Sequence, residues 1–404
     1  MVQRIAAKGV EFIRRQHRVF KVNIARNLVS NFSIGLTQQY QSIYVSALGA
    51  GPVELGLVSS VGGIASTLFT VPMGWLADRY GIRRMLMSGM AVVLLSFVTF
   101  GLARSWLMGG LAMGFFTMGF SFMMVVCPMI CGNTLRSEER VTGMQLCDTV
   151  SALPRLVAPI MAAYLITSFG GMNAGGIRPL FWFSAAGFLI SLIVVYLYLE
   201  NPIQPSGKGG SILGGFDRVF KEGTMVTRWL IFTMVSSIPM YLAFYIPLYA
   251  KEIKGADPYV VGLMDSAYWM SSVFLALPVG VLADRYGRKK MVALLTPLYC
   301  MALVALLGST NDVVLILAGL LNGFLMLGGI TQAAIGMELV PREILGSWTG
   351  LNALSRGVVS IAAPIIGGLL WASLGPEYVF YLIIATQVVK LVILWTFPSS
   401  VTRG

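Results

Sequence analysis

Charged side chains are scarce in this chain of 404 residues. Asp, Glu, Lys and Arg together make up 11% of the sequence, whereas hydrophobic residues make up 56%. A soluble globular domain carries about 25% charged residues. A water-soluble fold would need a very large core with almost no polar shell, so the composition favours a protein embedded in a lipid bilayer.

Histidine and cysteine are also scarce. The one histidine, His17, lies outside the long apolar runs, which excludes histidine-based metal or proton chemistry in the membrane. The four cysteines fall within apolar runs and show neither metal-ligand nor disulfide spacing. No glycine-rich nucleotide loop of the Walker type is found either. We therefore expect no enzyme activity, no cofactor and no bound metal.

Long apolar runs are what the chain has in abundance. Runs of 18 residues or more recur along most of its length, which is typical of membrane-spanning helices. At about 20 residues per span, the chain accommodates about twelve. The predicted spans cover residues 22–48, 55–78, 84–103, 106–132, 144–168, 179–199, 229–249, 259–283, 289–307, 313–337, 347–372 and 378–397.

The basic residues are distributed unevenly between the two sides of these spans. Of the 29 Lys and Arg residues, 21 fall on the side that holds both termini, four on the other side and four inside spans. Cytoplasmic loops carry the excess of basic residues, so both termini are predicted to be cytoplasmic. The net charge of +12 is therefore interpreted as a topology signal and not as a nucleic-acid surface.

A break in composition divides the chain. Residues 201–228 begin with a stretch rich in Pro, Gly and Ser that is typical of a linker. Residues 1–19 alternate basic and apolar positions, as in a helix that lies at a membrane surface. The predicted organisation is a cytoplasmic amphipathic segment (1–19), a six-helix bundle (20–200), a cytoplasmic linker (201–228) and a second six-helix bundle (229–404).

Two internal repeats support a duplication. The hexapeptide Leu-Ala-Asp-Arg-Tyr-Gly occurs at Leu76–Gly81 and again at Leu282–Gly287, 206 residues later. Ala158–Ala163 and Ala363–Gly368 share the pattern Ala-Pro-Ile at an offset of 205. Parallel six-span repeats place a binding site between the two halves near the middle of the membrane. The expected fold is all-α, with twelve transmembrane helices in two pseudo-symmetric six-helix bundles.

The repeated hexapeptide and its flanks resemble the signature of the major facilitator superfamily, Gly-x-Leu-Ala-Asp-Arg-x-Gly followed by bases. The resemblance covers roughly residues 20–400. It implies that the motif forms a latch between the two halves in the outward-open state. The latch residues would be Gly74, Asp78, Arg79, Gly81 and Arg83 in the first copy, and Gly280, Asp284, Arg285, Gly287 and Lys289 in the second.

The two proline segments resemble the family's span-5 signature Gly-Pro-x-x-Gly-Gly, which is associated with antiporters. Ala158, Ala162 and Ala163 replace glycines in the first copy. The buried arginine that the family carries in span 4 is absent, since Met113–Phe116 occupy that position. A proton mechanism that relies on that arginine therefore does not carry over to this chain.

Four charges inside spans are candidates for the cavity or for proton coupling, because burying a charge in a membrane is costly. Arg155 and Asp265 lie at similar depths in spans 5 and 8 and could pair across the halves, either in gating or as a static ion pair. Alternatively, each could be hydrated separately by the cavity. Asp148 could titrate during transport or simply stay hydrated. Arg356 and Arg155 would together attract an anion, or each could bond to helix carbonyls. Arg26 and Lys390 are expected to reach towards the cytoplasmic surface.

Polar side chains on the predicted cavity-lining spans are the substrate-cavity candidates. Four amides of span 1 share one face, and a stripe of amides facing lipid would be costly, so they are expected to face protein or water. The family places spans 1, 4, 7 and 10 around its cavity. The candidates are Asn27, Asn31, Gln38, Gln41, Tyr241, Tyr245, Asn322 and Gln332.

The predicted function is secondary active transport of a small organic solute by alternating access. The first choice is proton-coupled efflux. The alternatives are an organic-anion or metabolite carrier that uses the deep arginines, and a membrane sensor that does not transport. The expected partners are the substrate, the lipid bilayer and protons, with no nucleic acid. A monomer in the cell membrane is expected, with both termini in the cytoplasm.

Overall fold

The computed structural model describes residues 15–135, 140–199, 224–340 and 345–397, and these ranges fold into α-helices and short 3-10 helices. The first half contains α2 (Arg18–Thr37), η1 (Gln38–Tyr40), α3 (Gln41–Ala47), α4 (Pro52–Tyr80), α5 (Ile82–Leu102), α6 (Trp106–Thr134), α7 (Arg140–Ala152), α8 (Pro154–Ser168) and α9 (Ala174–Tyr198). The second half contains α11 (Thr224–Leu242), η3 (Ala243–Tyr245), α12 (Ile246–Glu252), α13 (Pro258–Tyr286), α14 (Arg288–Gly308), α15 (Asp312–Asn322), α16 (Phe324–Glu338), α17 (Leu345–Ser373) and α18 (Glu377–Trp395).

These helices form twelve runs that coincide with the twelve predicted spans, which confirms the all-α fold. Four runs contain a local break: two are interrupted by η1 and η3, one at Leu153 before Pro154, and one at Gly323. Proline cannot continue a helical hydrogen-bond ladder, but it fits the first position of a new helix, as Pro154 does in α8. The predicted 1–19 segment and the predicted linker lie largely outside the described residues.

The first helical run differs from the others in composition. Eleven helical segments of the described chain are long and apolar enough to cross a membrane, and Arg18–Ala47 is not among them. The reason is its polar stripe, which includes Asn23, Arg26, Asn27 and Ser30. These side chains are buried among neighbouring helices, so their polar groups avoid lipid.

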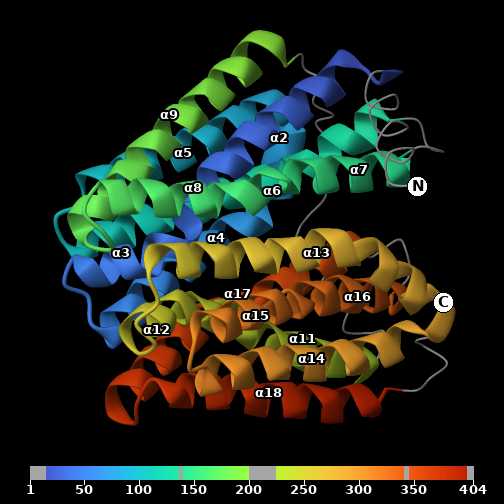
Figure 1. Ribbon diagram of the computed structural model, residues 1–404. Coiled ribbons are helices and arrows are strands. Elements are labelled where there is room, and N and C mark those ends of the chain that lie inside the picture. Colours follow the sequence, from blue (N-terminus) through green and yellow to red (C-terminus); the bar gives the residue numbers. More distant parts are fainter. Residues whose placement is uncertain (1–14, 136–139, 200–223, 341–344, 398–404) are drawn as a thin grey trace.

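Figure 1 shows the first half as one layer of helices and the second half as another, with their long axes side by side. The start of α2 and the end of α18 lie at the same end of the molecule, on the right. We call this the terminal end and the opposite one the distal end. Two tight turns at the terminal end use a glycine with positive φ: Gly81 (82°) before α5 and Gly287 (97°) before α14. Only glycine adopts this backbone conformation without strain.

The most extensive contacts between the two halves are made by two helix pairs, α4 with α17 and α8 with α13. Small residues allow α4 and α17 to approach closely. A Cβ added to Gly63 would lie 2.6 Å from the backbone oxygen of Ser360, and one added to Gly357 would clash with Thr67. Ser60 Oγ donates a hydrogen bond to the carbonyl of Ile361 at 2.6 Å. Close backbone packing through small residues is a general means of joining helices in membranes.

The helix order allows a direct test of the predicted orientation. Cysteines introduced at Ser206, in the predicted linker, and at Arg104, an exposed residue after α5 at the distal end, should react from opposite sides of the membrane. We expect membrane-impermeant maleimide to label Arg104→Cys from outside intact cells and Ser206→Cys only after permeabilisation. A background without the native cysteines is the control. Labelling of both positions from the same side would contradict the topology.

Candidate functional site

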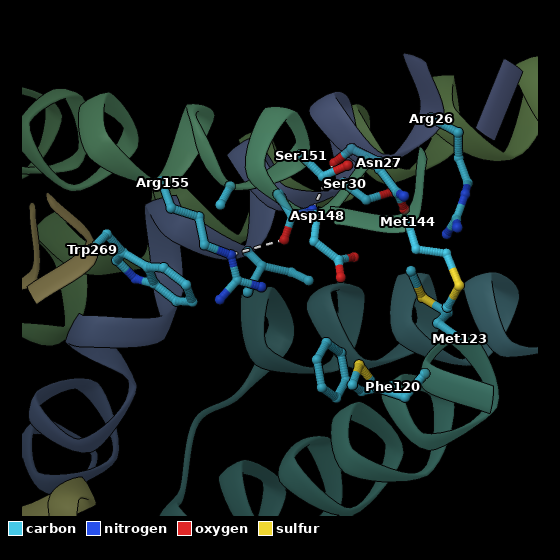
Figure 2. A pocket seen from close by; sticks show the side chains of 14 residues that line it. Arg26, Asn27, Ser30, Phe120, Met123, Met144, Asp148, Ser151, Arg155 and Trp269 are labelled. Atoms are coloured by element: carbon cyan, nitrogen blue, oxygen red, sulfur yellow. Dashed lines mark hydrogen bonds between the residues drawn. The ribbon is translucent and has the colours of Figure 1, made fainter. Parts of the chain in front are cut away.

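A cavity of about 280 Å³ lies on the inner side of the first half, between α2, α6 and α7. Figure 2 shows Asp148 and Arg155 pointing into the cavity, with Phe120 and Met123 on its opposite wall. Among the described lining residues, Trp269 of α13 is the one that the second half contributes. The cavity is lined by Arg26, Asn27, Ser30, Asn31, Ile34, Phe120, Met123, Met124, Met144, Asp148, Ser151, Ala152, Arg155 and Trp269.

The polar wall of the cavity comes from one face of α2. Arg26, Asn27, Ser30, Asn31 and Ile34 follow the three- and four-residue spacing of a helix face. At 1.5 Å per residue they extend over about 12 Å of the helix. The face runs from mid-span towards the start of α2, so the cavity extends towards the terminal end.

Arg155 is held by polar groups of the first span and by an aromatic ring from the other half. Its Nε donates a hydrogen bond to Asn31 Oδ1 at 2.8 Å, and its Nη1 donates to Gln38 Oε1 at 3.3 Å. The guanidinium carbon lies 4.4 Å from the ring centroid of Trp269. A cation over an indole face is attracted by the ring electrons, more strongly where water is excluded. Arg155 therefore joins α8 to α2 and to α13.

The predicted pairing of Arg155 with Asp265 is not formed as an ion pair. The two charges are close enough to interact electrostatically. Within the described part of the chain, however, no nitrogen–oxygen contact of 4.0 Å or less joins them, and Asp265 does not line the cavity. Trp269 lies one turn beyond Asp265 on α13 and occupies the guanidinium face instead.

The most exposed charged side chain of the described cavity wall is the carboxylate of Asp148. Arg26 is 1% exposed and Arg155 is 8% exposed, and both donate hydrogen bonds to amide side chains of α2. Asp148 is more exposed than either arginine, and it also lines the cavity. The opposite wall is apolar and polarisable, with Phe120 and Met123 among its side chains. The described lining thus combines the exposed carboxylate of Asp148 and two buried arginines with a soft apolar surface.

The other predicted cavity residues lie elsewhere. Gln41 is buried in α3, and Arg356 is exposed on α17 near Tyr241. Asn322 and Gln332 lie on α15 and α16 in the second half, where Asn322 Oδ1 is buried without a hydrogen bond to the described residues. These four side chains and Tyr241 do not line the described cavity. Tyr245 lies at the junction of the halves.

The two copies of the hexapeptide motif are described to different extents. The side chains of Asp78 and Arg79, and the surroundings of Gly74, lie outside the described part. Arg83 Nη2, just after that copy, donates to the carbonyl of Tyr196 at 2.6 Å. In the second copy, Arg288 forms an ion pair with Asp284 at 3.5 Å and another with Glu338 of α16.

The remaining motif residues of the second copy also stay within their own half. Arg285 lies 5.6 Å from the ring centroid of Tyr286, Gly280 has open space around it, and Lys289 Nζ donates to the carbonyl of Phe397 at 2.5 Å. The described contacts of this loop therefore do not join the two halves.

The latch role of the first copy stays a prediction. Asp78→Asn removes a charge that would interact with a helix N-terminus, which is worth about 0.3–2 kcal/mol and shifts a two-state ratio about 2- to 30-fold. We expect a bias towards the inward-open state and a large loss of transport with normal membrane insertion. Asp312→Asn, at the exposed start of α15, is the matched control. Wild-type flux through the folded Asp78→Asn protein would rule the latch out.

Arg26 and Trp269 line the cavity although the sequence candidates did not include them. Arg26 was expected to reach the cytoplasmic surface, but it is buried and its Nη2 donates to Asn23 Oδ1 at 2.8 Å. That expectation was wrong because Arg26 lies on the same buried polar face of α2 as Asn27. The helical spacing of Arg26 relative to the amides of this face could have indicated its burial. Trp269 gave no local signal, since it reaches the cavity from the other half.

Comparison with known proteins agrees with this architecture. The family profile described as Major Facilitator Superfamily matches residues 27–258 and 230–403. Multi-drug resistance efflux pump PmrA of Streptococcus pneumoniae is 23% identical over 372 residues, covering 88% of this chain and 90% of that protein. Multidrug resistance protein MdtG of Dickeya zeae is 22% identical over 380 residues, covering 90% of each.

A solved structure shows the same fold. The crystal structure of nucleoside transporter NupG superposes with a TM-score of 0.76 at 13% identity, covering 94% of this chain and 98% of that one. The profile match spans nearly the whole chain and both six-helix halves. The resemblance carried by the repeated hexapeptide is therefore confirmed, and the chain belongs to the major facilitator superfamily, a family of membrane transporters and not of enzymes.

Proposed function

We propose that this transporter exports small organic compounds with an apolar body and a positive charge, in exchange for protons, by alternating access. The observation that carries the proposal is the pairing of an accessible carboxylate, Asp148, with an apolar Met and Phe wall in one cavity. A carboxylate can bind either a proton or an organic cation, so the two would compete for the same group. Competition of this kind couples their movement in opposite directions.

The position of the cavity supports export. It extends towards the terminal end, which the distribution of basic residues assigns to the cytoplasm. At the distal end, by contrast, side chains of the two halves join each other, as in the 3.0 Å hydrogen bond from Ser46 Oγ to Glu252 Oε1. A substrate would therefore enter from the cytoplasm. The similarity to multidrug efflux pumps supports the same direction.

The wall chemistry supports a broad range of substrates. Met side chains are flexible and polarisable, so they adapt to ligands of different shape. Phe120 and Phe116 stack at 5.9 Å between ring centroids, which adds an aromatic surface on α6. Ligand pockets of this type combine a mostly apolar lining with a few polar groups that orient the ligand.

An organic-anion carrier is the second candidate, because Arg155 faces the same cavity. Its guanidinium, however, already donates to Asn31 and Gln38 and stacks on Trp269. An anion would have to compete with these contacts. Arg356, the second arginine of that hypothesis, does not line the described cavity.

Flux through proteoliposomes tests the proposal. The purified protein is reconstituted with an acidic interior and an alkaline exterior, and uptake of ethidium is compared with uptake of carboxyfluorescein. We expect ethidium uptake that depends on the pH gradient and stops when a protonophore collapses it. Uptake of the anion alone would favour the second candidate. Absence of gradient-driven uptake of either compound would argue against proton-coupled export.

A further inference from the structure

Tyr40 in the first half joins the two halves at the distal end. It is the last residue of η1, the 3-10 break in the first span, and its side chain is fully buried. Its hydroxyl donates to the carbonyl of Pro258, at the start of α13 in the other half, at 2.8 Å. The carbonyl of Pro159, in α8 of its own half, lies 3.4 Å from the same hydroxyl.

Tyr245 makes the equivalent contacts from the second half. It is the last residue of η3, the 3-10 break in the seventh span, and is also fully buried. Its hydroxyl lies 3.1 Å from the carbonyl of Pro52, at the start of α4 in the other half. It lies 2.9 Å from the carbonyl of Pro364, in α17 of its own half.

The two arrangements are copies of each other at the level of single residues. Tyr40 and Tyr245 are 205 positions apart, as are Pro159 and Pro364. Pro52 and Pro258 are 206 positions apart. Gly56 and Gly262 are also 206 positions apart, and their lack of a side chain leaves room for these contacts. A Cβ added to Gly262 would lie 2.6 Å from the Pro159 carbonyl oxygen and 2.9 Å from Tyr40 Oη, and one added to Gly56 would clash with the Pro364 carbonyl.

The chemistry of a hydroxyl makes this arrangement reversible. A tyrosine has one O–H hydrogen, so the two carbonyls in reach of each hydroxyl compete for it. One of them belongs to the other half and moves away when the halves separate. The other belongs to the tyrosine's own half and stays. The hydroxyl therefore keeps a partner in both states and is not left unsatisfied in a buried site, which would be costly.

We propose that Tyr40 and Tyr245 are a pair of gate-positioning residues that close the distal end by sharing their hydroxyl hydrogen with a carbonyl of the other half, and release it by turning fully to the proline carbonyl of their own half. This inference rests on the proposed alternating-access function and names the residues that hold one of its two states. The 3-10 segments that carry both tyrosines interrupt their spans at equivalent points, as local hinges do.

The test measures the distal end directly and does not depend on transport. Spin labels are placed at Arg104→Cys and Asp312→Cys, exposed positions at the distal end of opposite halves, in a background without the native cysteines. Distance distributions are recorded by electron–electron double resonance in reconstituted protein. One ordinary hydrogen bond corresponds to about a 2- to 10-fold change in an equilibrium constant. We expect Tyr40→Phe and Tyr245→Phe each to raise the open-to-closed ratio by that factor, and the double variant to multiply the effects.

Tyr44→Phe is the matched control. Tyr44 lies one turn after Tyr40, is fully buried, and its hydroxyl donates to the carbonyl of Phe100 within the first half at 2.9 Å. The same hydroxyl accepts a hydrogen bond from Arg178 Nε at 3.3 Å, also within the first half. Tyr44→Phe therefore removes hydroxyl contacts of the same kind without changing any contact between the halves, so the distal distances should not change. Equal shifts in Tyr44→Phe and Tyr40→Phe, or no shift in the folded double variant, would overturn the proposal.

The glycines supply a second, independent measurement. Gly56→Ala and Gly262→Ala place a methyl group against a carbonyl of the opposite half, so both should move the distal distances in the same direction as the tyrosine variants. Gly89→Ala, whose added Cβ would meet Phe122 of the same half at 2.6 Å, should not.

If the distances behave as expected but proton-driven flux is absent, the gate stands and proton-coupled export is refuted. Distances that do not respond refute the gate alone.

Discussion

Asp148→Asn is expected to reduce proton-driven uptake of an organic cation at least about tenfold. The substitution keeps the size of the side chain but removes the accessible negative charge of the cavity. Hydrogen bonds to a charged group contribute about 1.5–3 kcal/mol, and 1.4 kcal/mol is a factor of ten in affinity. The measurement is the initial rate of ethidium uptake into proteoliposomes across a series of imposed pH gradients, together with the equilibrium affinity for ethidium.

Two variants separate loss of charge from loss of fold in this experiment. Asp148→Glu keeps the carboxylate and should retain part of the gradient-driven rate. Asp312→Asn removes an acidic group from the exposed start of α15 and should leave both the rate and the affinity unchanged. Gradient-driven uptake by Asp148→Asn within about twofold of wild type would show that the proton is carried by another group.

Arg155→Met is expected to destabilise the protein more than any other single change in the cavity. The new side chain is unbranched and apolar, and it cannot donate to Asn31 and Gln38 or stack as a cation on Trp269. Lost charged hydrogen bonds and a lost cation–π contact suggest a cost of about 2–4 kcal/mol in apparent unfolding free energy. Thermal unfolding of the purified protein in detergent measures it, with Arg104→Met in the exposed distal loop as the control. A melting temperature unchanged from wild type would contradict the role of Arg155 as a junction residue.

A double-mutant cycle identifies the partner of Arg155. We expect coupling of about 0.5–2 kcal/mol between Arg155→Met and Trp269→Leu, because the guanidinium and the ring are in contact. The coupling of Arg155→Met with Asp265→Asn should be smaller in this state, since no ion pair joins them. Larger coupling to Asp265 than to Trp269 would mean that the ion pair forms in the state that dominates in solution.

Much of the architecture could be predicted from the sequence because it depends on local chemistry. Long apolar runs predict spans, since a bilayer requires about 20 apolar residues per helix. The turns at Gly81 and Gly287 also depend on local chemistry, because a backbone with positive φ favours glycine whatever surrounds it. The buried polar face of α2 was also predictable, because helical spacing shows which residues share a face and lipid excludes amides.

The partners of individual side chains were decided by the tertiary structure. Spacing placed Arg155 and Asp265 at similar depth, but the rotation of α13 about its axis presents Trp269 to the guanidinium. Tyr245 was predicted to line the substrate cavity, but its hydroxyl contacts the backbone carbonyls of two proline residues. The direction of a backbone carbonyl depends on the conformation of the chain around it, so the sequence pattern did not indicate these contacts. A sequence thus determines how many helices form and which face each one buries, because both depend on residues close along the chain. Which faces meet across the two halves depends on the crossing and rotation of helices far apart in sequence, and only their packing determines that.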